Sequence, residues 1–166
     1  MLENKKLKKF SFNFDYKVLC NKDKAIEAVL YIVNKQEIIS SFYLNKILYF
    51  AEKYNMEYTG NMIYYLQYIH NLNGVEVLKL EQLVRHAYKS LELETTLHKD
   101  CFFIKTRKEY KQIYLSFAEL KSIDSAYEYC LPLNYGQLIK ETTIEGLNYI
   151  APEHYDLSYR DFIFIE

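Results

Sequence analysis

Histidine and cysteine are among the residue types in this chain that could bind a metal or act as nucleophile and base. Such sites need short, regular spacings, as in H-E-x-x-H or C-x-x-C, or a cysteine beside a base. These residues are instead scattered along the chain: His70, His86, His98 and His154, with Cys20, Cys101 and Cys130. We therefore expect isolated, structural histidines and three reduced thiols, as in a cytoplasmic protein, and no metal site.

Paired carboxylates could instead catalyse a reaction by general acid–base chemistry. Glu141 and Glu145, or Asp156 and Asp161, could face each other, but acidic pairs at these spacings are usually solvated. The four glycines are isolated, so the sequence has no glycine-rich loop that would hold a phosphate. The sequence thus predicts neither an enzyme nor a cofactor.

Basic and aromatic residues alternate around a predicted β-hairpin. Residues 101–104 and 110–115 are aromatic or β-branched, and the charged residues 105–109 would form the tip between them. Lys105, Arg107 and Tyr110 could contact a phosphate backbone or stack on bases. However, the pI of 6.4 argues against non-specific nucleic-acid binding, and a solvated tip is the more ordinary interpretation. A DNA-binding or phage-associated regulatory protein that uses this basic hairpin is the alternative function.

Helical periodicity dominates the elements that would position these residues. Leu44, Ile47, Leu48 and Ala51 fall at i, i+3, i+4 and i+7, which predicts a mostly buried central helix that begins at Ser40 or Ser41. We expect Asn55 to cap its end and Gly60 to permit the following turn.

Further helices are expected on the same grounds over residues 23–35, 75–93, 116–131 and 135–141. Ser116 and Glu119 form a capping box at the start of one of them. Residues 62–72 are assigned to a helix, although their tyrosines and isoleucines would also suit a strand. A short final element is expected over residues 157–165.

The composition indicates a globular protein. Half of the 166 residues are apolar or aromatic, which is enough for one domain with a core. We expect a mainly α (α+β) fold, a compact helical domain of about five to seven helices with a small β-hairpin. Residues 1–22 would form a basic tail and arm, and residues 23–166 the single domain. The sequence contains no signal-peptide pattern and no membrane-spanning run, so we expect a cytoplasmic protein that does not contact the membrane.

Charge is unevenly distributed along the chain, which suits a protein-binding module. Residues 1–111 carry 18 Lys and Arg against 13 Asp and Glu, whereas residues 112–166 carry 3 against 9. Arginine and tyrosine are frequent at the energetic centres of interfaces. The predicted partner-binding residues lie on one turn, the helix after it and the basic hairpin: Gly74, Lys79, Arg85, Tyr88, Lys105, Arg107 and Tyr110.

Several short strings, in this order, resemble the Panacea domain, the SocA-like antitoxin family of bacteria and their phages. Residues 44–51 match its Leu-x-Lys-(Leu/Ile)-Leu-Tyr-Phe-Ala helix, and residues 115–120 match its Leu-Ser-x-x-Glu-Leu helix start. Residues 157–161 are similar to its Ile-Ser-Tyr-Glu-Asp ending. The likeness covers roughly residues 23–165. The chain lacks the proline of the family's Gly-Pro-Val string and its late tryptophan, which marks a divergent member.

The resemblance implies an antitoxin that neutralises a cognate toxin protein by direct binding. A variant of this role is an adaptor that delivers the toxin to a bacterial protease. Neither role requires a cofactor or a catalytic residue. Family members neutralise unrelated toxins, so the resemblance names neither the toxin nor the oligomeric state.

Overall fold

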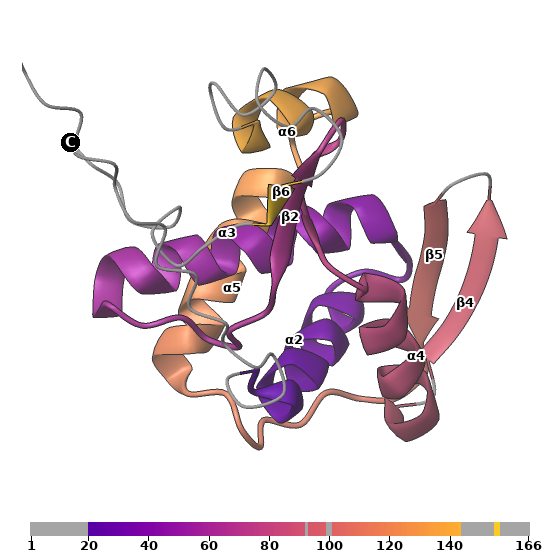
Figure 1. Cartoon of the computed structure of the whole chain (residues 1–166). Helices are drawn as coiled ribbons and strands as arrows, with labels where there is room; N and C mark the ends of the chain where they lie inside the picture. Colours follow the sequence, from indigo (N-terminus) through magenta and orange to yellow (C-terminus); the bar gives the residue numbers. More distant parts are fainter. Residues whose placement is uncertain (1–19, 92, 99–100, 144–154, 157–166) are drawn as a thin grey trace, which may run out of the picture.

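The computed structural model describes residues 20–91, 93–98, 101–143 and 155–156 (Figure 1). Most of the described chain is helical. The helices are α2 (Lys22–Asn34), α3 (Ser41–Thr59), α4 (Leu80–Leu91), α5 (Phe117–Cys130) and α6 (Tyr135–Thr142). The strands are β1 (Ile39–Ser40), β2 (Tyr68–Asn71), β3 (Gly74–Val77), β4 (Leu93–His98), β5 (Cys101–Thr106) and β6 (Tyr155–Asp156). The expected mainly α, α+β fold class is confirmed.

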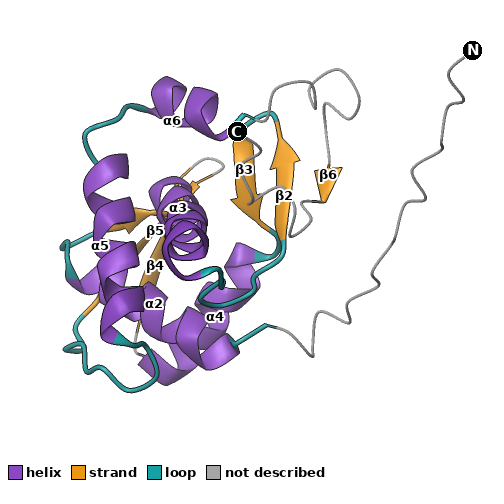
Figure 2. Cartoon of the chain, turned by 90° about the vertical axis from the view of Figure 1, so that its left-hand side faces the viewer, coloured by secondary structure: helices purple, strands orange, loops and turns teal. Residues whose placement is uncertain are grey.

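The strands form two small antiparallel sheets, with the orders β1–β5–β4 and β3–β2–β6. Figure 2 shows α3 end-on in the middle of the molecule, with α5 on one side and the β2–β3 hairpin on the other. Helix α2 lies below α3 in Figure 1 and packs against α4. The core is therefore arranged around α3.

Helix α3 is the buried central helix that the apolar spacing predicts. Leu44, Ile47 and Leu48 are fully buried, and the Ser40 hydroxyl caps the first turn by accepting from the Tyr43 N–H. Gly60 ends the helix in the left-handed conformation, with φ at 73°.

The expectation that Asn55 caps α3 is wrong, because the helix continues to Thr59. Asn55 lies inside the helix and is buried. Its side-chain amide donates to the Asn61 carbonyl, at 2.8 Å, and its oxygen accepts from the Ser122 hydroxyl. Asn55 thus joins α3 to the following loop and to α5.

Polar contacts join the α2 region to α5 at two places. Lys24 Nζ forms an ion pair with Glu119 near the start of both helices. Farther along, Lys35 Nζ and the Tyr31 hydroxyl each lie 2.7 Å from the same oxygen of Asp124. The predicted capping box of Ser116 and Glu119 is confirmed at the start of α5. These contacts fix the angle and register of the two helices.

Two helix assignments made from the sequence, both after α3, are wrong. Residues 62–72 do not form a helix, because residues 63–66 bond to a buried carboxylate and residues 68–71 pair with β3. The helix expected over residues 75–93 begins only at Leu80, since Gly74–Val77 is strand β3.

The β-hairpin is also displaced along the sequence. Strand β5 pairs with β4 and not with residues 110–115, which form a loop. The charged residues 105–109 therefore connect β5 to that loop instead of forming a hairpin tip. Most of the tail and arm expected over residues 1–22, and the element expected over residues 157–165, lie outside the described residues.

Replacing Leu48 tests the position of the core. Leu48→Ala should lower the free energy of unfolding by about 2–5 kcal/mol, because it leaves a cavity at a fully buried site. The control Leu72→Ala removes a leucine that is 75% exposed and should change it by less than about 0.5 kcal/mol. Urea unfolding followed by circular dichroism measures both. Equal effects of the two changes would contradict the position of α3 at the centre of the core.

Candidate protein-interaction site

Four of the predicted partner-binding residues lie at two places on the described surface. Lys79 and Arg85 are exposed at the start and in the middle of α4. Lys105 is half-buried and Arg107 is exposed, near the end of β5. The side chain of Tyr88, on α4, lies outside the described part of the structure.

Gly74 lies in a tight, buried turn between β2 and β3. Its φ is +78°, and a Cβ atom here would overlap the hydroxyl of Thr142 in α6. Lys46, which is fully buried in α3, donates from Nζ to the carbonyls of Asn73 and Val75, at 2.5 and 2.7 Å. The close packing of this turn between α3 and α6 therefore explains why a glycine stands here.

Tyr110 is turned inward, against α2. Its ring lies 4.7 Å from the Tyr31 ring, and its hydroxyl donates to Glu27 at 2.9 Å. Burial, together with the hydrogen bond to Glu27, raises the pKa of Tyr110. The aromatic face expected to contact a partner is thus occupied within the protein.

The same carboxylate of Glu27 also fixes the backbone that follows Tyr110. It accepts hydrogen bonds from the backbone N–H groups of Ile113, Tyr114 and Leu115, at 2.9, 2.5 and 3.2 Å. The residue is only 5% exposed, so water does not compete strongly for these bonds. One side chain of α2 thereby supplies the hydrogen bonds that a neighbouring strand would otherwise supply.

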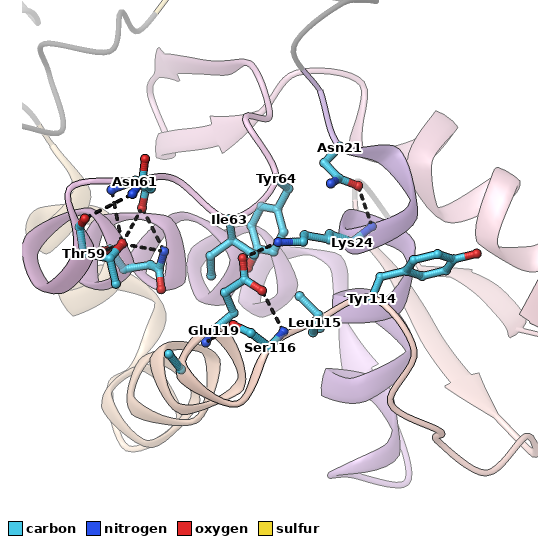
Figure 3. Close-up of polar contacts among 12 residues, drawn as sticks. Asn21, Lys24, Thr59, Asn61, Ile63, Tyr64, Tyr114, Leu115, Ser116 and Glu119 are labelled. Carbon is cyan, nitrogen blue, oxygen red and sulfur yellow. Dashed lines mark hydrogen bonds and ion pairs between the residues drawn. The ribbon is translucent and has the colours of Figure 1, made fainter.

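The start of α5 is fixed in a similar way (Figure 3). Glu119 accepts from Lys24 Nζ and from the Ser116 N–H, at 2.5 and 2.7 Å. Burial opposes ionisation of Glu119, but these two hydrogen bonds outweigh it and lower the pKa of this carboxyl. The loop is therefore fixed at both ends, by Glu27 on one side and by Glu119 on the other.

This fixed loop presents large apolar side chains to solvent. Ile113, Tyr114 and Phe117 are 71%, 54% and 81% exposed, whereas Leu115 between them is 3% exposed and lies in the core. Figure 3 shows Tyr114 directed away from Glu119. We call Ile113, Tyr114 and Phe117 the 113–117 patch. Three large, exposed apolar side chains within five residues of a hydrogen-bonded segment are typical of a protein-interaction surface.

Sequence reasoning missed the 113–117 patch because it placed residues 110–115 in a strand. Alternation along a strand would put Ile113 and Leu115 on the same face. The structure separates them, since the Glu27 carboxylate draws three successive N–H groups toward α2. No local signal in the sequence distinguishes the exposed isoleucine from the buried leucine.

The histidines and carboxylates considered for catalysis or metal binding either lie apart from one another or fall outside the described part of the structure. His70 is fully buried on β2, and burial lowers its pKa. Residues 144–154 and 157–166 are outside the described part, as are the side chains of His86 and His98. Among the side chains that are described, no group of three or more histidines, cysteines, aspartates and glutamates could hold a metal ion.

Two buried ionisable groups on α3 have shifted pKa values. Burial raises the pKa of Glu52 to about 8, although the backbone N–H groups that donate to it act in the opposite direction. Burial lowers the pKa of Lys46 to about 8. Both side chains bond to the backbone of the segment after α3, so a structural role accounts for them.

Of the helices in the described part, none is both long enough and apolar enough to cross a membrane.

Comparison with known proteins identifies no relative of this chain. No protein-family model, curated protein or solved structure matches it. The resemblance to the Panacea domain therefore rests on the short sequence strings described above, such as residues 44–51 and 115–120.

Replacing Glu27 tests whether it fixes the loop. Glu27→Gln substitutes an amide NH₂ for one acceptor oxygen, so backbone N–H groups lose a partner. We expect the amides of Ile113, Tyr114 and Leu115 to exchange with deuterium about tenfold faster, and the free energy of unfolding to fall by about 1–3 kcal/mol. Glu128→Gln, an exposed position on α5, is the matched control and should change neither. Unchanged exchange at these three amides in Glu27→Gln would contradict the assignment.

Proposed function

We propose that this protein is an antitoxin that neutralises a toxin protein by direct protein–protein binding. The observation that carries the proposal is the 113–117 patch, whose exposed apolar side chains stand on a backbone held by Glu27. A fixed loop loses little conformational entropy on binding, so more of its contact energy appears as affinity. The antitoxin class is supported by the resemblance of residues 44–51 and 115–120 to the Panacea domain.

The mode of neutralisation that we favour is a direct block. In this mode the toxin is inactive for as long as it stays bound at the 113–117 patch, and no chemical step is involved. In the adaptor variant, the same contact would present the toxin to a protease, and the toxin would disappear instead of accumulating in the complex. The two modes therefore differ in the amount of toxin present during rescue.

A DNA-binding regulator is the second candidate. Arg107 and Lys108 are exposed after β5 and could lie on a phosphate backbone. The position of Tyr110 weighs against this role, because its ring packs on Tyr31 and its hydroxyl bonds to Glu27. A tyrosine held in this way has its hydroxyl and one side of its ring already in contact with the protein, which leaves less of it for stacking on a base.

Co-expression tests the antitoxin function. Each neighbouring open reading frame is expressed alone and together with this chain, and growth is scored. One neighbour should arrest growth alone, and co-expression should restore growth with the two proteins co-purifying. A copy of the gene with an early stop codon is the control and should not rescue.

Two further outcomes of co-expression are informative. Rescue with loss of the toxin in normal cells, but not in protease-deficient cells, would assign the adaptor variant. Harmless neighbours on both sides would contradict the antitoxin function.

A further inference from the structure

We infer that the 113–117 patch, with the basic side chains around it, is the docking surface for an acidic protein segment that carries apolar side chains. The inference rests on the proposed function in taking the partner to be a protein. It adds the place of contact and the chemistry of the partner's surface.

The apolar part of this surface is continuous along the chain and fixed in position. Ile113 and Tyr114 precede the buried Leu115, and Phe117 follows at the first position of α5. Single exposed apolar residues are common on proteins, but three within five residues on a hydrogen-bonded loop are not. Aromatic side chains fixed in this way suit the anchor positions of an interface.

The exposed charged residues that flank the patch in the sequence are predominantly basic. Arg107, Lys108 and Lys111 are exposed on the loop before it, and Lys121 is exposed one turn after Phe117 on α5. The exposed acidic residue in this stretch is Glu109.

The two carboxylates nearest the patch, Glu27 and Glu119, are both buried. Backbone N–H groups of the loop and the Tyr110 hydroxyl donate to Glu27, and Glu119 forms an ion pair with Lys24. Complementary charge across an interface favours an acidic partner surface and speeds its association.

Nucleic acid and a second copy of this chain fit the surface less well. Ile113 and Phe117 would find no apolar surface on a phosphate backbone, and the whole chain carries a net charge of −1. A symmetric dimer through this patch would bring two surfaces with the same excess of basic residues against each other, which is unfavourable. An acidic protein segment with apolar side chains complements both the basic residues and the exposed apolar side chains of this surface.

A displayed library of random short peptides tests this inference without knowledge of the natural partner. Full-length protein is immobilised, and bound peptides are recovered and sequenced. We expect enrichment of peptides that combine Asp or Glu with aromatic or aliphatic residues. Their affinity should fall about tenfold or more in Phe117→Ser and in Lys111→Glu, and it should weaken with added salt.

The matched control is Leu72→Ser. Leu72 is 75% exposed in the turn between β2 and β3, beside α6, whereas Phe117 is at the opposite end of α5 (Figure 1). Peptide binding to Leu72→Ser should equal binding to the wild type. Thermal melts of the three variants should match the wild type, because all three side chains are exposed.

Several results would overturn the inference: no enrichment, enrichment of neutral or basic peptides, or binding that Phe117→Ser leaves unchanged. Retention of a DNA duplex that depends on Phe117 would also overturn it. Peptide binding at the patch without growth rescue by any neighbour would contradict the antitoxin function but support the docking surface. If growth rescue is unchanged in Phe117→Ser and no peptides are enriched, the docking surface is contradicted but the antitoxin function is supported.

Discussion

Two buried carboxylates on neighbouring helices hold two segments of the described chain that form neither helix nor sheet. Glu27 on α2 accepts from three successive backbone N–H groups before α5, and Glu52 on α3 accepts from Ile63, Tyr64 and Leu66 before β2. A buried N–H without a partner costs about 1–3 kcal/mol, so each carboxylate offsets several such costs at once. Both segments can therefore lie against the core without regular structure.

The same constraint determines what the surface presents. Because Glu27 binds successive N–H groups, the side chains on this loop cannot alternate as in a strand, and Ile113 and Tyr114 point outward together. Leu115 is then returned to the core, and the capping box places Phe117 at an exposed helix start. The proposed interaction surface is thus a consequence of how the core satisfies its backbone hydrogen bonds.

The helices and their caps could be predicted from the sequence because their signals are local. The spacing of Leu44, Ile47 and Leu48 identifies α3, and Ser116 with Glu119 identifies the start of α5. Residues 62–72 and 110–115 were assigned wrongly because the N–H groups of residues 63–66 and 113–115 bond to carboxylates on helices, while residues 68–71 pair with β3. Glu27 is 83 to 88 residues from the groups that it bonds. No pattern within a short window records such a pairing, so the 113–117 patch was also missed.

If Glu27 holds the loop before α5, this loop is as rigid as the helices of the core. Backbone ¹⁵N relaxation measured on the wild-type protein tests this claim most directly. The amides of Ile113, Tyr114 and Leu115 should show order parameters near those of α3 and α5, about 0.85. Values below about 0.6 at these three amides would mean that Glu27 does not hold the loop, and would contradict the account.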